Sequence, residues 1–301
     1  MPFVYFPYMK ICVIANPAKY AVRDALLATL QWCIDKEIEV FLSHQLAGLA
    51  ENLSHNHITC TGSEQEAIDR ASVIVAVGGD GTMLHTATMV GSSGKQILGI
   101  NTGKMGFLAN VKTGDITSAL NHVLEGNFET DKRCVLEATD QNGNTHYALN
   151  EFVFLKQSTV SMITLSAWCD DLFINRYWAD GLIVSTPTGS TAYNMSSGGP
   201  IVYPGTDVMI LTPISPHMLT TRPLVLPAKS TIRIASDPAE QQILFSNDGQ
   251  IPDIKGDALT VEIRRSDYTI DLIHMPGQSY FETLREKLMW GIDLREQRPR
   301  A

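Results

Sequence analysis

Five consecutive residues, Gly78-Gly79-Asp80-Gly81-Thr82, combine glycines with a carboxylate and a hydroxyl. Glycines let main-chain N–H groups approach a phosphate closely, and a helix that begins here adds partial positive charge. In such a place Asp80 is suited to hold a hydroxyl for attack on phosphorus, or to bind the magnesium that accompanies a nucleoside triphosphate. The simpler interpretation is a tight turn in which Asp80 caps the next helix. Because the pentapeptide directly follows a buried apolar run, the pattern favours phosphate handling.

A second polar stretch, residues 180–200, also follows a short apolar run and is rich in hydroxyls and glycines. Hydroxyls and exposed N–H groups at a helix start suit phosphate or ribose oxygens. Tyr193 offers a flat face for a base, and Asp180 can accept hydrogen bonds from an amide or a sugar hydroxyl. On composition alone, a loop that merely caps a helix is the commoner role.

The elements before residue 127 must position the glycine turn. Val73–Val77 reads as a strand buried on both faces, and a helical pattern begins at Thr82. Other strands are predicted over 11–15, 39–42 and 97–100, and helices over 21–33, 63–70 and 116–124. Strands that alternate with helices predict a doubly wound α/β domain.

Local signals refine this first part. Ser63 with Glu66 forms a capping box, and Asp115 is expected to cap the helix over 116–124. Residues 43–62 are polar and weakly patterned, so we expect a solvated loop, whose histidines do not have the spacing of a metal site. Residues 101–108 form a glycine-punctuated loop at the carboxyl end of a strand, which is either a ligand site or a plain connection.

The pattern changes near Asn127, where short alternating strands replace the helices. They include a hairpin around Asn142-Gly143 and a final pair of strands, 259–264 and 268–273. We expect a β-sandwich-like domain over 127–278 and an α/β domain over 1–126. Ser279 with Glu282 forms a second capping box for a helix over 280–290, and we expect 279–301 to return to the first domain.

Composition excludes several classes of function. The formal net charge of −9 argues against broad, charge-driven binding to nucleic acid or to an anionic membrane. The five cysteines are scattered without a Cys-x-x-Cys pair, which indicates reduced thiols and no zinc site. No apolar stretch approaches the roughly 20 residues that span a bilayer, and Met1–Tyr8 lacks the features of a signal peptide. We therefore expect a cytoplasmic protein with neither a nucleic-acid nor a membrane partner.

Taken together, the motifs resemble those of NAD kinases, specifically of the bacterial type. The glycine turn alone is shared with diacylglycerol and sphingoid lipid kinases and with phosphofructokinases. The whole set occurs in the family's order and spans nearly the whole chain: Gly78–Thr82, Asn101–Leu108, Asn150-Glu151, Asp180–Pro200 and Asn247–Gln250. Several motifs in one order are more specific than any single one.

The resemblance implies an activity. ATP would donate its γ-phosphoryl group, with Mg²⁺, to the 2′-hydroxyl of the adenosine ribose of NAD, and the product would be NADP. Asp80 is the implied catalytic carboxylate, within a phosphate turn made by Gly78, Gly79 and Thr82. Gly81 would lie against the dinucleotide or the phosphates. His85 would assist phosphate binding, although a helix-surface histidine is an equal alternative.

The resemblance also implies an NAD pocket in the second domain. Asn150 and Glu151 would bind ribose hydroxyls. The other implied NAD contacts are Asp180, Thr188, Thr191, Ala192, Tyr193, Asn194, Met195, Ser196 and Gln250. Asp180 and Gln250 would act from a neighbouring subunit, since the family forms homo-oligomers, here a dimer or tetramer. One departure is Trp178, where relatives often have a basic or polar residue; Arg176 lies close by in the sequence.

Two other functions stay open. A lipid kinase shares the glycine turn and would need an apolar acceptor pocket. A non-catalytic NADP-binding sensor would keep the pocket alone, although such a protein has no need of Asp80.

Overall fold

The computed structural model describes residues 9–19, 21–50, 56–103, 106–157, 161–237, 243–252, 254 and 258–290. Met1–Tyr8, Lys104, Met105 and the segment after Trp290 lie outside the described residues. The chain divides into two compact units, Met1–Asp131 with Asp271–Ala301, and Lys132–Ile270. The sequence places these divisions near residues 126 and 278. The difference arises because two long strands, β7 (Glu129–Asp140) and β17 (Thr260–His274), run across the division.

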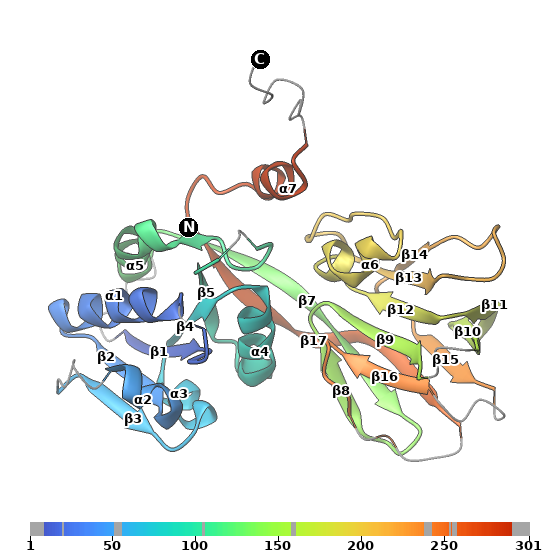
Figure 1. The fold of residues 1–301 in the computed structure, drawn as a ribbon, viewed down its shortest axis with the longest axis horizontal. Coiled ribbons are helices and arrows are strands. Elements are labelled where there is room, and N and C mark those ends of the chain that lie inside the picture. The colour runs from blue at the N-terminus through green and yellow to red at the C-terminus, as the bar shows by residue number, and fades with distance from the viewer. Residues whose placement is uncertain are drawn as a thin grey trace, which may run out of the picture. The chain divides into compact units, whose positions relative to one another are not determined.

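The first unit is built on a parallel sheet (Figure 1). Its strands follow the order β3-β2-β1-β4-β5, and the end of β17 pairs with β5. They are β1 (Lys10–Ala15), β2 (Glu39–Ser43), β3 (Ile58–Thr61), β4 (Val73–Gly78) and β5 (Gln96–Asn101), with a short β6 (Val111–Lys112) beside β5. Since β1 lies between β2 and β4, the chain reverses its direction across the sheet there. This point is the topological switch, outside whose carboxyl ends open α/β sheets bind ligands.

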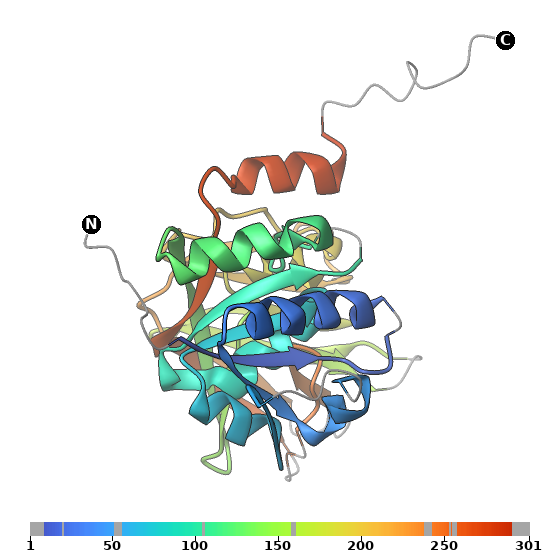
Figure 2. The ribbon, with the colours of Figure 1, turned by 90° about the vertical axis from the view of Figure 1, so that its left-hand side faces the viewer.

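Helices cover both faces of this sheet (Figures 1 and 2). On one face α1 (Val22–Asp35) packs beside α5 (Ile116–Leu124), and on the other α3 (Glu64–Arg70) packs beside α4 (Asp80–Val90). Strand β4 is buried along its whole length, which explains its unbroken run of apolar residues. These layers confirm the doubly wound α/β fold.

The second unit is made of antiparallel strands. One sheet has the order β14-β13-β12-β9-β16, and the other places β11, β10 and β15 beside β17. The first consists of β9 (Glu151–Lys156), β12 (Gly181–Ser185), β13 (Val208–Ile214), β14 (Leu224–Pro227) and β16 (Ile243–Asn247). The second contains β10 (Ile163–Cys169), β11 (Leu172–Ala179) and β15 (Ile232–Ser236), and β7 pairs with β17 and with β8 (Thr145–Ala148).

A shared core joins the two sheets of this unit. Alternate residues of β9 and β12, such as Phe152 and Leu182, meet alternate residues of β10 and β15, such as Leu165 and Ile232. The Phe152 and Phe245 rings stack with centroids 5.4 Å apart. Alternate side chains of both sheets meet in this core, which is the pattern of a β-sandwich, as predicted.

Several local expectations are wrong. Residues 43–62 contain α2 (His44–Ala50) and β3, not one loop. The expected strands 259–264 and 268–273 are one continuous strand, β17, because Ser266 is buried in the strand and makes no turn there. Helix α4 begins at Asp80, two residues before Thr82. The caps at Asp115 and Ser279 form no side-chain hydrogen bond, whereas Ser63 accepts from Glu66 N at 3.1 Å.

The C-terminal helix α7 (Tyr280–Leu288) belongs to the first unit. Leu284 is its buried residue, and the Tyr280 ring lies 6.4 Å from the Phe107 ring. The helix thus meets the loop that follows β5. Among the described residues, no helix combines the length and the apolar character needed to cross a bilayer.

Candidate functional site

The glycine turn links β4 directly to α4. Gly79 is extended and precedes the helix, and its carbonyl accepts hydrogen bonds from Thr82 N at 2.9 Å and Met83 N at 3.1 Å. Gly78 lies against Thr82, because a Cβ at Gly78 would be 2.2 Å from Thr82 Oγ1. A Cβ at Gly79 or Gly81 would meet nothing within 4 Å. The turn is therefore packed on the Gly78 side and open at Gly79 and Gly81, where an anion can approach the helix N-terminus.

Asp80 is fixed by the loop after β5. Phe107 N donates to Asp80 Oδ2 and Leu108 N donates to Oδ1, both at 3.0 Å. A Cβ at Gly106 would lie 2.0 Å from Asp80 Oδ1, so only glycine allows this approach. The loop 101–108, predicted as either a ligand site or a plain connection, thus orients the candidate catalytic carboxylate. Lys287 Nζ, from α7, lies 3.4 Å from Oδ2.

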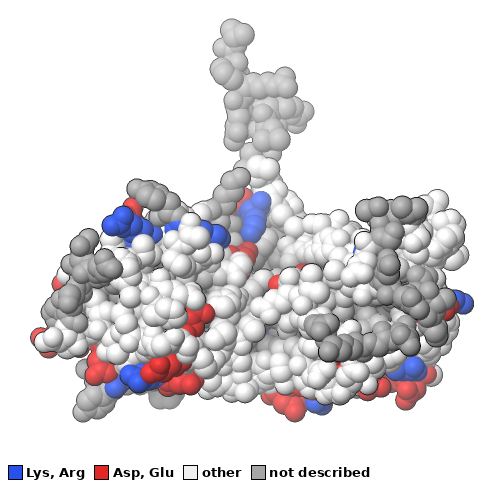
Figure 3. Space-filling model, turned by 60° about the horizontal axis from the view of Figure 1, so that its bottom comes forward, with Lys and Arg blue, Asp and Glu red and all other residues white. Residues whose placement is uncertain are grey.

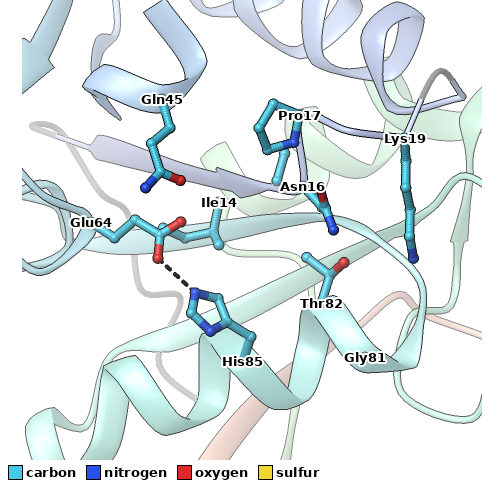
Figure 4. A pocket seen from close by; sticks show the side chains of 10 residues that line it. Ile14, Asn16, Pro17, Lys19, Gln45, Glu64, Gly81, Thr82 and His85 are labelled. Atoms are coloured by element: carbon cyan, nitrogen blue, oxygen red, sulfur yellow. Dashed lines mark hydrogen bonds and ion pairs between the residues drawn. The ribbon is translucent and has the colours of Figure 1, made fainter.

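A pocket of about 520 Å³ opens at the switch point, beside this turn (Figure 4). The side chains of Asn16, Lys19 and Thr82 face the same space in Figure 4. Its lining comes from the end of β1 and the segment after it, from α2, and from the starts of α3 and α4: Ile14, Ala15, Asn16, Pro17, Lys19, Gln45, Glu64, Gly81, Thr82 and His85. Polar groups and one lysine in a concave site beside a helix N-terminus suit a phosphorylated ligand.

His85 and Glu64 are hydrogen-bonded on the wall of this pocket. His85 Nε2 lies 2.6 Å from Glu64 Oε2, and the Glu64 side chain is 17% exposed. Sequence reasoning considered His85 but missed Asn16, Lys19 and Glu64. The first two follow β1 at the switch point, so the strand order would have revealed them; Asn16-Pro17 alone indicates only a turn.

In the second unit, Asn150 and Glu151 are held by Asp248, which sequence reasoning did not select. The Asp248 carboxylate accepts from Leu149 N at 2.7 Å, Asn150 N at 2.8 Å and Glu151 N at 3.0 Å. Asp248 and Gly249 both have positive φ, at 47° and 81°, which are the dihedrals of a type I′ hairpin turn. The Asp-Gly pair after a predicted strand was the available signal for this turn, although not for its partners.

The Glu151 side chain is buried, and its Oε2 has no hydrogen-bond partner among the described residues. Burial, followed by the nearby Asp248 charge, raises the pKa of Glu151 to about 8. Burial also raises the pKa of Asp248, against the lowering effect of its three N–H donors. An unpaired buried carboxyl group costs stability unless a ligand or a proton satisfies it.

The loop after β12 lies on the same segment. Thr186 Oγ1 donates to Leu149 O at 2.6 Å, and a Cβ at Gly189 would be 2.2 Å from Asn150 O. Thr188 is buried and accepts from Arg133 Nη1 at 3.3 Å. The structure therefore brings Asn150, Glu151 and Thr188 together, as the sequence motifs imply.

The next residues differ in exposure. Tyr193 and Ser196 are exposed, whereas Thr191, Ala192 and Met195 are half-buried. Asn194 is fully buried, with donations from its Nδ2 to Ser190 O and Pro200 O, both at 3.1 Å, and a 2.6 Å donation from Thr212 Oγ1 to its Oδ1. Its side chain thereby fixes the short helix α6 (Tyr193–Ser196).

The remaining predicted residues have protein partners or lie at the surface. Asp180 pairs with Lys156 at 2.5 Å, and Gln250 is exposed after the Asp248 turn. Arg176, considered as a ligand contact, pairs with Asp237 at 2.6 Å. Trp178 is half exposed, and its ring centroid is 4.2 Å from that of His217. Among the described residues no group of three or more His, Cys, Asp or Glu side chains is arranged to hold a metal ion.

The first unit is doubly wound, carries a carboxylate at a helix N-terminus and has a polar pocket at its switch point. This arrangement is suited to proteins that transfer phosphoryl groups. Family models of the ATP-NAD kinase N-terminal and C-terminal domains match residues 11–128 and 149–275. The chain belongs to the ATP-NAD kinase family.

Individual relatives agree with the family models. An NAD kinase of Flavobacterium psychrophilum is 36% identical over 294 residues, which are 95% of this chain and 100% of that protein. An NAD kinase of Flavobacterium johnsoniae is 40% identical over 241 residues, 78% of this chain and 82% of that protein.

Solved structures resemble the fold. A yeast NADH kinase complexed with NADH has a TM-score of 0.89 at 25% identity, covering 97% of this chain and 91% of its own. An NAD kinase from Archaeoglobus fulgidus in complex with ATP has a TM-score of 0.74 at 25% identity, covering 93% of this chain and 99% of its own.

Proposed function

We propose that this chain is an NAD kinase that transfers the γ-phosphoryl group of ATP to the 2′-hydroxyl of the adenosine ribose of NAD, giving NADP. One observation carries the proposal: the Asp80 carboxylate stands at the N-terminus of α4, fixed by two N–H groups of the loop after β5, beside the pocket at the switch point. The NAD kinase relatives supply the acceptor, since the phosphate turn alone leaves it open.

The donor triphosphate is assigned to the first unit. In the phosphate turn, Gly78 packs against Thr82, Gly79 and Gly81 leave the helix N-terminus open, and Lys19 offers a cation in the adjoining pocket. Mg²⁺ commonly keeps several waters and is held by one or two carboxylates together with substrate phosphates. Asp80 with a bound triphosphate fits that donor set without a preformed cage. When bound, the ion would neutralise charge on the phosphates.

The acceptor is assigned to the second unit. Asn150 and Glu151 would hold ribose hydroxyls, for which the orphaned Glu151 Oε2 is suited. Thr188, Thr191, Ala192, Tyr193 and Ser196 would form the adenosine pocket, with Met195 beside them. Asn194 would serve this pocket by fixing α6, since its side-chain atoms are already hydrogen-bonded within the protein.

Asp80 would orient the 2′-hydroxyl in line with the γ-phosphorus and accept its proton late in the reaction. Phosphoryl transfer has a loose transition state, so positioning and charge neutralisation account for most of the rate. A carboxylate of ordinary basicity is therefore adequate. The two N–H donors fix the carboxylate in one orientation, which is the contribution that positioning requires.

The remaining proposals concern the setting of the enzyme. The homo-oligomer, a dimer or a tetramer, would let Asp180 and Gln250 contact NAD from a neighbouring subunit. Leu172 and Phe173 are exposed on the edge strand β11, which supports a subunit contact there.

The thiols of Cys12 and Cys33 are free and buried, and burial raises the pKa of each to about 12. Such thiols are consistent with a cytoplasmic location. Charges on the face drawn in Figure 3 are mixed in sign, which favours small-molecule partners over a polyanion.

The decisive assay combines the protein, Mg-ATP and either NAD or NADH, and detects the phosphorylated dinucleotide with an NADP-specific dehydrogenase. We expect Asp80→Asn to lower turnover by roughly 10²–10⁴ while NAD binding is retained. Asp24→Asn, at an exposed position of α1, controls for the lost charge. Phosphorylation of diacylglycerol micelles but not of NAD or NADH would establish the lipid kinase instead. Dinucleotide binding without any ATP-dependent product would establish the non-catalytic sensor.

A further inference from the structure

Lys287 reaches the Asp80 carboxylate from the opposite end of the chain. Its Nζ lies 3.4 Å from Asp80 Oδ2, across 207 residues of sequence. The same Oδ2 accepts from Phe107 N, so a main-chain donor and an ammonium group share one carboxylate oxygen. The contact lies near the surface, since the two side chains are 33% and 32% exposed.

The position of this ammonium group is fixed by an aromatic ring. Lys287 Nζ lies 4.5 Å from the centroid of the Phe107 ring, a cation–π distance. Tyr280, seven residues earlier on α7, also meets the Phe107 ring. Leu284, between them, is the buried residue of the helix. Residues at i, i+4 and i+7 share one helix face, so one face of α7 is directed to the loop that holds Asp80.

Other large apolar residues in α7 and directly after it are more exposed than Leu284. Phe281, Met289 and Trp290 are each more than half exposed. The face with Tyr280, Leu284 and Lys287 is thus the part of α7 that docks, and its polar member is directed to Asp80.

We propose that Lys287 is a positioning residue for Asp80: its ammonium group holds the carboxylate in the orientation that receives the acceptor hydroxyl. The inference rests on the proposed function, because it assigns a role within that reaction. Lys287 acts through Asp80 in the transition state and does not hold the substrates. Its loss therefore lowers kcat and leaves the KM values for NAD and Mg-ATP nearly unchanged.

The test compares Lys287→Met, Lys287→Arg and Arg285→Met with the full-length wild-type chain. Arg285→Met is the matched control, since it removes a cation from the same last turn of α7. For a partly exposed ion pair we expect Lys287→Met to lower kcat about five- to tenfold, with both KM values within about twofold of wild type. Lys287→Arg should restore kcat to within about twofold, because a guanidinium group can also stack on Phe107 and pair with Asp80. Arg285→Met should retain the wild-type kcat.

Three kinetic results would overturn the inference. They are an unchanged kcat in Lys287→Met, an equal loss in Arg285→Met, or a loss confined to the KM for Mg-ATP, which would make Lys287 a donor-binding residue. Thermal unfolding followed by circular dichroism accompanies each assay; a Lys287→Met chain that does not fold would assign the lysine to the stability of α7 and likewise reject the positioning role. Failure of the wild type to make NADP or NADPH refutes the proposed function itself, whereas a wild-type rate with an unaffected Lys287→Met refutes only this inference.

Discussion

The buried carboxyl group of Glu151 makes the stability of the second unit depend on pH. Glu151 is 8% exposed, its Oε2 is unpaired, and burial and the Asp248 charge raise its pKa from 4.5 to about 8. A carboxyl group whose pKa is raised on folding stabilises the fold fully below pH 4.5, and this contribution is lost as the pH rises through about 8. Glu151→Gln replaces the acid by a neutral group of the same shape, so the variant has no such dependence.

The size of the effect follows from proton linkage. Between the two pKa values, each pH unit removes about 1.4 kcal/mol of the free energy of unfolding from the wild type. From about pH 5 to about pH 7.5 the advantage of Glu151→Gln over the wild type should therefore grow by about 3 kcal/mol. The second cause of the shift is testable by the same logic. Asp248→Asn removes the neighbouring charge, lowers the pKa of Glu151 and so moves the upper end of this pH window downward.

Urea denaturation followed by tryptophan fluorescence at several pH values measures this difference. Glu262→Gln is the matched control, because Glu262 is exposed on β17 in the same unit. A difference between Glu151→Gln and wild type that stays constant from pH 5 to pH 7.5 would refute the reasoning. So would the same slope in Glu262→Gln, since the effect would then belong to the net charge and not to the buried site.

Two other predictions concern the first unit and the oligomer. Gly106→Ala places a Cβ 2.0 Å from Asp80 Oδ1, and displacement of the carboxylate should lower kcat roughly 10²-fold. In Gly103→Ala the nearest described atom to the new Cβ would be Asn101 Oδ1 at 4.0 Å, so this variant should leave steady-state kinetics unchanged. Equal losses in the two variants would contradict the steric argument. Phe173→Asp places a charge on the edge strand β11, where we propose the subunit contact, so it should yield a smaller species in sedimentation velocity. Leu219→Asp, at a residue that is 87% exposed, should leave the species unchanged. An unchanged sedimentation coefficient in Phe173→Asp would place the subunit contact elsewhere.

Most of the elements could be predicted because buried strands and helices show a regular spacing of apolar residues in the sequence. Strand β4 is buried throughout and reads as an unbroken apolar run, and α1 repeats its apolar residues at helical spacing. The elements that were predicted wrongly lie where this spacing of apolar residues is weak. Strand β3 is at the edge of the sheet with two exposed residues, and α2 has only seven residues. Ser266 is polar but buried within β17, so the sequence suggests a turn where the strand continues.

The sequence pointed to Asp80 and the Asn150 segment as candidate site residues, but not to the residues that hold them in place. Asp80 was selected, yet its partners Phe107 and Leu108 follow by 27 and 28 residues, and Lys287 by 207. Asp248 reaches the Asn150 segment across about a hundred residues in the same way. A single sequence shows local preferences only. These contacts depend on which loops the fold brings together, so no local sequence pattern predicts them.

The glycines of the motifs show the same division between chemistry and support. The sequence assigns the glycines of residues 78–82 to close approach by a phosphate and leaves the loop 101–108 as either a ligand site or a plain connection. In the structure Gly78, Gly106 and Gly189 instead allow close approach by Thr82, Asp80 and Asn150, respectively, which a Cβ would meet at 2.2 Å or less. Gly79 and Gly81 have open space where a Cβ would stand, and they alone of these five leave room for a ligand at the α4 N-terminus. A glycine-rich motif in this chain therefore encodes two requirements at once: three positions hold the site's polar groups against the backbone, and two keep its entrance clear.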